Sequence, residues 1–495
     1  MEIIKITTSG MSHLFMTIFL HHFSTFMVLP AITDVTMSAI CPGEDECSLA
    51  IYLTGFQQAF MEIPVITDVT MSAVCPGKSE CSLAIYLSGF QQAIIGLGTL
   101  VTMPLMGNLS DKYGRKALLT APVTLTVIPL AILAYSRTKS FFYAYYILKT
   151  LTAMLCEGSV HCLALAYVAD NVPEERRATV FGILSGIGSC AFVCGNISTR
   201  FLSTSSTFQV ATTVAIVAAI YMRIFLPESM KDGDLYTPIL SEGKLEINDS
   251  GERCSTKKVD CSGQNSTKKV QLFEGLPSIE DTVSLLKTST TFSQAAIVAF
   301  FSNLADLGLH ASTMYYLKAK FHFNKDQFAD LMVISGIAGT VSQLVMMPIL
   351  VPILGESRLL SIGLFFSCVH MFLYSVAWSS WVPYAAAVFS ILFVFSQPCM
   401  RTIVSKQVGP CEQGKAQGCI QGICSFASVV SPLVFSPLTA LFLSDRAPFN
   451  FPGFSIMCIG FAATQSPHIS CVDDSLHSEY HDKGGASYFE SKSQQ

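Results

Sequence analysis

The segment Gly107–Lys116, with the sequence GNLSDKYGRK, is a short polar and basic stretch between two long apolar runs, 82–106 and 117–134. Gly107 and Gly114 carry no Cβ, so they allow the backbone to turn tightly. We therefore interpret this stretch, called the latch segment below, as a turn between two membrane-spanning helices. It decides where one helix leaves the bilayer and the next one enters, so the other helices can be counted outward from it.

The charged residues of the latch segment predict which side of the membrane it faces. Lys112, Arg115 and Lys116 place three positive charges at one membrane edge, and an excess of basic residues is typical of cytosolic loops. Asp111 stands where it can accept hydrogen bonds from the free N–H groups of the next helix or from a nearby basic side chain. We expect this edge, and the N-terminus with it, to be cytosolic.

The composition indicates a chain that lies in lipid. Charged residues make up 13% of it and hydrophobic residues 51%, with a mean hydropathy of +0.49, whereas soluble domains carry about 25% charged residues. The 17 cysteines show no CxxC pair and no Cys/His metal spacing, so we expect no metal and no cofactor. No phosphate-binding glycine loop or nucleophile elbow is present, and the 35 Phe are typical of core and lipid-facing positions rather than of base stacking. We expect neither an enzyme nor a nucleic-acid partner.

Apolar runs that approach or exceed the roughly 20 residues needed to span a bilayer recur along the chain. We expect helices at 12–32, 82–106, 117–134, 141–168, 180–201, 208–226, 292–317, 328–350, 359–378, 382–404 and 417–443. The last apolar run, 451–464, has only about 14 residues, which indicates either a truncated last helix or a polar tail drawn partly into the bilayer. We favour a replaced C-terminus, as from alternative splicing or a frameshift. These runs predict an N-terminal six-helix bundle at 1–227, a flexible cytosolic linker at 228–290, a C-terminal helix bundle at 291–464 and a polar tail at 465–495.

The first non-cytosolic loop contains a duplicated segment. Residues 32–59 recur as 66–93, and only four pairs of residues differ. This is too close for an ancient repeat, so it indicates a recent local duplication or an exon counted twice, and we expect the first copy to add no single crossing. Each copy holds a C-x5-C pair that is either a disulfide or two free thiols. The four cysteines are Cys41, Cys47, Cys75 and Cys81.

The two halves of the chain echo each other. GILSGIGSCAFVCGN begins at Gly182 and GCIQGICSFASVVSP begins at Gly418, 236 residues later. At that constant offset, glycine, serine and alanine positions match, and small residues four apart let helices pack closely in lipid. The echo supports two pseudo-symmetric six-helix bundles that arose by duplication.

These motifs resemble those of a known family. The pattern G-x-L-x-D-x-x-G-R-K resembles the signature loop between helices 2 and 3 of the major facilitator superfamily, where it acts as a gate latch. AYVADNVPEERRATVFGILSG, at 166–186, is similar to the plant version of the hippocampus abundant transcript-like proteins, which resemble tetracycline-resistance exporters. The resemblance implies an all-α major facilitator fold of twelve helices, a central cavity lined by helices 1, 4, 7 and 10, and alternating access. The chain departs from drug antiporters at Gly195-Asn196, where they have Gly-Pro, and has Lys149 where the family commonly has Arg.

Ionisable and polar side chains inside the expected helices are the candidates for substrate and proton contacts, because each charge costs about 2.5–3.5 kcal/mol at mid-bilayer. Glu157 and His161 share a helix face, as do Asp306 and His310, because each pair is four residues apart. We expect the two acids to take up and release a proton. The alternative is that each is locked in a static helix–helix pair. The full set is His21, His22, Lys149, Glu157, His161, Asp306, His310, Gln397 and Arg401, with a kink expected at Pro398.

These observations favour a secondary active transporter of a small organic solute. We expect it to be a monomeric, multi-pass protein of the lipid bilayer that couples solute movement to protons. Two alternatives stay open at this point. One is a membrane receptor or scaffold that kept a transporter fold, and the other is a non-functional product of an aberrant transcript. The substrate, the direction, the coupling ion and the choice between plasma membrane and endomembrane have no pattern in a single sequence.

Overall fold

The computed structural model describes residues 10–28, 82–136, 138–156, 158–229, 286–287, 289–323, 325–409, 412–443 and 447–465. Nine helical segments within these residues are long and apolar enough to cross a membrane. The same residues contain no β-strand, so the chain is an all-α multi-pass membrane protein, as the composition predicts. The duplicated segment 32–59/66–93 with its four cysteines lies outside the described residues except for its last turns, and so do most of the linker and the tail.

The N-terminal half contains a helix at 10–28 and four of the nine segments that can cross a membrane. Two of these spans are each divided between two helices: α5 and α6 form one, and α7 and α8 the other, with Gly158 in a left-handed conformation (φ 73°) between them. The helices are α4 (Ser82–Tyr113), α5 (Arg115–Leu125), α6 (Val127–Tyr135), α7 (Lys139–Cys156), α8 (Ser159–Asn171), α9 (Glu174–Ser198) and α10 (Thr204–Phe225).

The C-terminal half has two spans with irregular middles. A π-helical turn, Ser342–Met346, joins α13 to α14, and a short 3-10 turn, Ser390–Leu392, separates α16 from α17. The helices are α12 (Thr290–Phe321), α13 (Lys325–Val341), α14 (Met347–Leu354), α15 (Glu356–Ser375), α16 (Val382–Phe389), α17 (Ser396–Lys406) and α18 (Gln413–Phe442). A final apolar helix, Phe454–Gln465, follows.

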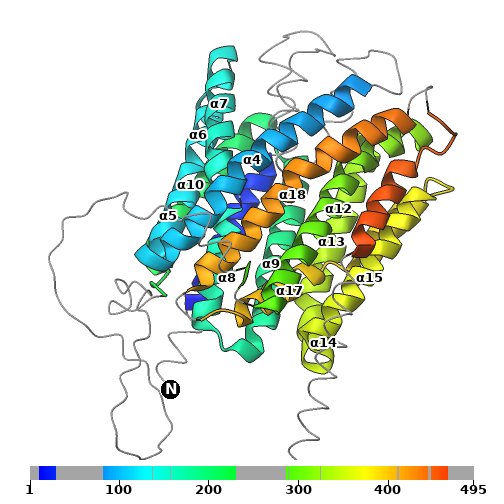
Figure 1. Ribbon diagram of the computed structural model, residues 1–495. Coiled ribbons are helices and arrows are strands. Elements are labelled where there is room, and N and C mark those ends of the chain that lie inside the picture. The colour runs from blue at the N-terminus through cyan, green and yellow to red at the C-terminus, as the bar shows by residue number, and fades with distance from the viewer. Residues whose placement is uncertain are drawn as a thin grey trace, which may run out of the picture.

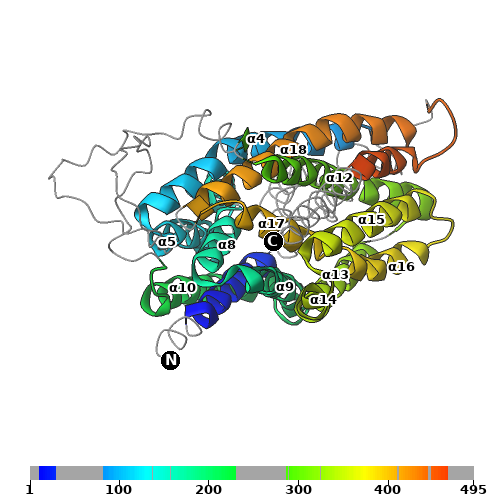
Figure 2. The ribbon, with the colours of Figure 1, turned by 60° about the horizontal axis from the view of Figure 1, so that its bottom comes forward.

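The two halves meet along two seams. One is formed by α4 and α18, which lie side by side along most of their length in both views (Figures 1 and 2). The other is formed by α9 and the span that contains the π-helical turn, where Gly186 faces Leu344 and Gly336 faces Phe192. Small residues at both seams let the backbones approach closely, which is how helices associate in lipid.

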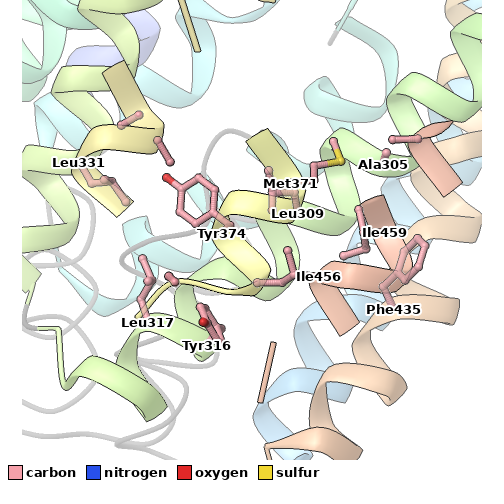
Figure 3. Packing of buried hydrophobic residues seen from close by; sticks show 14 of the residues in the cluster. Ala305, Leu309, Tyr316, Leu317, Leu331, Met371, Tyr374, Phe435, Ile456 and Ile459 are labelled. Atoms are coloured by element: carbon pink, nitrogen blue, oxygen red, sulfur yellow. The ribbon is translucent and has the colours of Figure 1, made fainter. Parts of the chain in front are cut away.

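The short last helix is a packed part of the C-terminal half. Ile456 and Ile459 belong to one hydrophobic cluster with Leu309 of α12, Met371 of α15 and Phe435 of α18, as the close-up in Figure 3 shows. Ile456 and Ile459 are fully buried. Within the described residues this helix covers Phe454–Gln465.

Two local predictions are wrong. Gly107 is not in a turn, because α4 continues through Tyr113 and only Gly114, with φ 93°, leaves the helix. The helical hydrogen bonds continue because the Gly107 face of α4 is covered by another helix. The span 382–404 is also not one helix kinked at Pro398. It is interrupted before that proline, at 390–395, and α17 restarts at Ser396.

Candidate functional site

The latch segment joins the two halves of the molecule at one end. Asp111 accepts hydrogen bonds from the backbone N–H groups of Gly414 (2.9 Å) and Lys415 (2.6 Å), which are the free donors at the start of α18. The sequence predicted donors from the next helix along the chain or from a nearby basic side chain. The helix is α18 instead, and the basic side chain is Arg115. A carboxylate at a helix N-terminus is stabilised both by the free N–H groups and by the helix dipole, so Asp111 holds α18 against α4.

Close backbone contact accompanies this hydrogen bonding. A Cβ on Gly107 would lie 2.2 Å from the Gly414 carbonyl oxygen and 2.9 Å from the Gly418 Cα. Gly107 is therefore needed for the crossing of α4 and α18 rather than for a turn. Gly418 is one of the echoed glycines of the sequence, and the structure gives it this second role.

Arg115 is a fully buried cation between two carboxylates. Its guanidinium pairs with Asp111 at 2.5 Å and with Asp170, at the end of α8, at 2.8 Å. It also donates to the Ser110 hydroxyl. Because both carboxylates are nearly buried, the arginine compensates two charges that would otherwise be desolvated alone.

The start of α5 is held by a residue that the sequence did not single out. Glu228, just after α10, accepts hydrogen bonds from the backbone N–H groups of Arg115 (2.8 Å) and Lys116 (3.1 Å). A side chain on Gly114 would clash with the Glu228 carboxylate at 2.9 Å, and Gly114 has a positive φ that favours glycine in any case. Lys116 thus contributes its backbone to the site.

A second contact joins the halves at the same end. Arg177, near the start of α9, donates to both the carbonyl oxygen (3.2 Å) and the hydroxyl (3.3 Å) of Ser405 on α17. Gln413, at the start of α18, donates to the same Ser405 carbonyl at 3.0 Å and accepts from its hydroxyl at 2.7 Å. Arg177 and Gln413 occupy equivalent positions at the 236-residue offset, so equivalent residues of the two halves converge on one serine.

The C-terminal half contains a charge-reversed counterpart of the Arg115–Asp170 pair. Gly355 (φ 78°) precedes α15 as Gly114 precedes α5. The first residue of α15, Glu356, pairs with Lys406 at the end of α17. The pair is half-exposed, with 22% and 28% of the side chains accessible, so it is weaker than the buried pair of the N-terminal half.

A cavity of ≈ 480 Å³ lies between the halves, mainly within the C-terminal half. Its wall includes the middle and far ends of the helices, remote from the latch segment. For example, His370 is 14 residues beyond the start of α15, a rise of about 21 Å. The lining residues are His22, Phe26, Gly188, Ser189, Phe192, Ser302, Asp306, Leu309, His310, Thr313, Leu331, Met332, Ser335, Gly336, Gly339, Gln343, Leu364, Ser367, His370, Tyr374, Ser390, Phe393, Val394, Ser396 and Gln397.

Four of the sequence-predicted residues meet in this cavity: His22, Asp306, His310 and Gln397. Asp306 accepts one long hydrogen bond from the Gln397 side chain, at 3.5 Å. His22 donates from Nδ1 to the Ile18 carbonyl at 2.9 Å. The structure therefore places a carboxyl group of one half and an imidazole of the other in the wall of one cavity.

The irregular turns of the C-terminal half lie at the cavity wall. Gln343, in the π-helical turn, accepts a hydrogen bond from Ser189 of the other half at 3.0 Å and donates to the Val394 carbonyl at 3.5 Å. Val394 lies in the interruption between α16 and α17. π-helical turns are frequent at functional sites, but no sequence pattern marked this one.

His370 is a second residue that the sequence did not indicate. It is 6% exposed, it lines the cavity, and its Nδ1 has no hydrogen-bond partner among the described residues. Its ring packs against Tyr374 and Phe393, with ring centroids 4.9 and 4.7 Å apart. A histidine in an apolar run is usually a packed core residue, so only its position could reveal it.

The remaining candidates lie elsewhere. His21, Lys149, His161 and Arg401 do not line this cavity. Arg401 is buried and points toward α18, where it donates to the Gln417 carbonyl at 3.2 Å and to the Gln421 side chain. Glu157 and the four cysteines of the repeated segment lie outside the described residues.

The chain matches known proteins over most of its length. The sequence profile of the Major Facilitator Superfamily matches residues 14–242 and 296–467. The bovine (Bos taurus) hippocampus abundant transcript-like protein 1 is 26% identical over 351 residues, which cover 70% of this chain but only 63% of that protein. The class C tetracycline resistance protein of Escherichia coli is 20% identical over 70% of this chain and 78% of its own.

A solved structure shares the fold. The human organic anion transporter MFSD10 (TETRAN) superposes with a TM-score of 0.70 at 15% identity, over 94% of this chain and 99% of that one. The resemblance to the major facilitator superfamily and to hippocampus abundant transcript-like proteins is confirmed, and so is the predicted fold class. The chain belongs to the Major Facilitator Superfamily.

Proposed function

We propose that this protein is a secondary active transporter of a small organic solute, that it works by alternating access, and that Asp306 carries a proton in each cycle. The observation that carries the proposal is the cavity of ≈ 480 Å³ with a carboxyl group in its wall, which residues of both halves line. Cavities of about 300–1,000 Å³ are typical of small-molecule sites.

The latch end supplies the gate. Two hydrogen-bonded contacts hold the halves together there: Asp111 with the start of α18, and Arg177 with Ser405. The cavity lies toward the other end. We infer that the latch end is cytosolic and that this conformation is closed toward the cytosol. In the alternate conformation both contacts have to separate, and the cavity then becomes accessible from the cytosol.

Asp306 is suited to carry a proton because it is the one carboxyl group among the described lining residues and has a single long hydrogen bond. A carboxylate without a cationic partner gains little from remaining charged in an apolar wall, so it exchanges protons as its access to water changes. The matching role of Glu157 stays a prediction.

Purified full-length protein in proteoliposomes that contain a pH-sensitive dye tests this function. Pools of organic cations, anions and neutral solutes are added outside, and the internal pH is followed. We expect at least one pool to drive proton movement in the wild type, and the Asp306→Asn variant to lose it. Glu175→Gln, which alters an exposed carboxylate near the start of α9, is the control. The proposal is contradicted if no pool drives proton movement in the wild type, or if the movement persists in Asp306→Asn.

The orientation has a separate test. A Lys112→Cys variant in intact cells is expected to react with a membrane-impermeant maleimide only after permeabilisation, because Lys112 is exposed at the latch end. Labelling of intact cells above the wild-type background would place the latch segment outside.

A further inference from the structure

Three polar side chains of the cavity wall can accept hydrogen bonds from a ligand. Asp306 has one long hydrogen bond, which leaves its carboxylate with free lone pairs. His22 donates from Nδ1 to the Ile18 carbonyl, so in the neutral ring Nε2 is an acceptor. His370 leaves Nδ1 without a partner although the side chain is 94% buried, and in the tautomer with the proton on Nε2 this nitrogen is an acceptor. A ligand that satisfies these groups has to donate hydrogen bonds.

The wall also lacks cationic side chains. None of the described residues that line the cavity is lysine or arginine. The Tyr374 hydroxyl donates to the Pro383 carbonyl at 3.2 Å, and the Gln397 amide donates to Asp306, so two of the neutral donors already have partners. An anionic solute would meet a carboxylate here and no permanent countercharge.

Aromatic rings provide the rest of the surface. Phe26 and Phe192 from the N-terminal half, and Phe393 from the interruption before α17, all line the cavity. Aromatic faces attract cations and bury apolar groups. The wall therefore combines a negative group, two imidazole acceptors and aromatic faces, which is the environment that suits an ammonium group with an apolar body.

The anchoring groups come from adjacent helices. Leu309 of α12 and Met371 of α15 pack in one hydrophobic cluster (Figure 3). Asp306 lies on α12 three residues before Leu309, and His370 lies on α15 directly before Met371. The His370 ring packs against Tyr374 and Phe393, which fix its orientation. Its Nδ1 therefore keeps a defined direction toward a ligand.

We propose that this cavity binds protonated organic amines, with Asp306 as the ionic partner of the ammonium group and His370 as an acceptor for one of its N–H bonds. This deepens the proposed function by naming the class of solute. It also assigns a substrate contact to α15, a helix that the family resemblance did not place at the cavity.

The first measurement compares matched ligands on the purified full-length protein in lipid nanodiscs. The ligands are phenethylamine, its trimethylammonium analogue and 3-phenylpropanoate, and binding is followed by the rise in unfolding temperature, which increases with ligand concentration over Kd. We expect phenethylamine to bind at least 10-fold more tightly than 3-phenylpropanoate. Asp306→Asn is expected to weaken both ammonium ligands at least 10-fold.

The role of His370 has a readout that a structural role would not move. The trimethylammonium analogue has no N–H bond to donate, so only phenethylamine can use Nδ1. His370→Phe keeps a ring of similar size and is expected to lower the affinity for phenethylamine about 10-fold while leaving the analogue within about 2-fold. His13→Phe is the control, because His13 bonds Tyr221 away from the cavity.

Tighter binding of 3-phenylpropanoate than of phenethylamine would overturn the proposal, and so would an equal effect of His370→Phe on both ammonium ligands. No transport is needed for this measurement, so amine binding without proton movement contradicts the transport function alone. Proton-driven movement of an anion through an intact Asp306, without amine binding, contradicts the amine site alone.

Discussion

Replacing Gly107 with alanine tests whether direct contact between α4 and α18 decides the conformation. The added Cβ would lie 2.2 Å from the Gly414 carbonyl oxygen, and ordinary contact begins at 3.4 Å, so the helices have to separate by about 1.2 Å at this point. The obstacle is backbone, which cannot turn away as a side chain does. Overpacking costs about 1–3 kcal/mol, which corresponds to a roughly 5- to 150-fold shift of population toward conformations in which the latch end is open.

Electron–electron distance measurements can follow this opening. Spin labels on non-natural amino acids avoid the 17 native cysteines. Lys112 in the N-terminal half and Ser357 in the C-terminal half are exposed positions near the latch end. We expect one predominant distance in the wild type and a second, longer one in Gly107→Ala.

Gly188→Ala is the matched control, since a Cβ there meets nothing within 4 Å and the position is helical. The distance distribution of this variant should equal that of the wild type. Identical distributions in Gly107→Ala and the wild type would refute the reasoning, as would equal changes in both glycine variants.

Three further predictions concern the charges at the latch end, and all are measured as shifts in thermal unfolding in detergent. Arg115→Gln should destabilise by about 3–5 kcal/mol, because it leaves two nearly buried carboxylates uncompensated, and a loss below 1 kcal/mol would show that they are solvated. Glu356→Gln, which breaks the half-exposed pair with Lys406, should cost no more than about 1 kcal/mol. A cost equal to that of Arg115→Gln would contradict the difference in burial. Glu228→Ala should cost about 0.5–2 kcal/mol, as for the loss of a helix cap. Glu228→Gln, which keeps an acceptor, should recover part of it, and equal losses in the two variants would argue against capping.

The general fold was predictable because lipid restricts the choices. A backbone in hydrocarbon has to satisfy its own hydrogen bonds, so long apolar runs with few charges become helices, and the basic latch segment marks one edge. The observed spans follow the predicted runs closely. Asp306, His310 and Gln397 also follow from the sequence, because a costly polar group in a span indicates a polar surrounding.

The rest depends on contacts between residues that are far apart in the chain. The partner of Asp111 is 303 residues away, so no local pattern indicates that Gly107 has to contact Gly414 rather than form a turn. Arg401 donates to Gln417 and Gln421 of the next helix, a contact that no pattern in its own helix indicates. No charged residue lies near His370 in the apolar sequence of α15. Only its unpaired nitrogen and its place at the cavity distinguish it from a core histidine.

The shared serine at the latch end makes separation of the halves an exchange of partners. When the halves part, Ser405 loses Arg177 but keeps Gln413, which stays in its own half. Its hydroxyl and carbonyl groups therefore never lack a partner inside the bilayer edge, and only the guanidinium has to be rehydrated. Arg177 is therefore the group that detaches and binds again. When the halves close, it returns to Ser405, which Gln413 has kept in place.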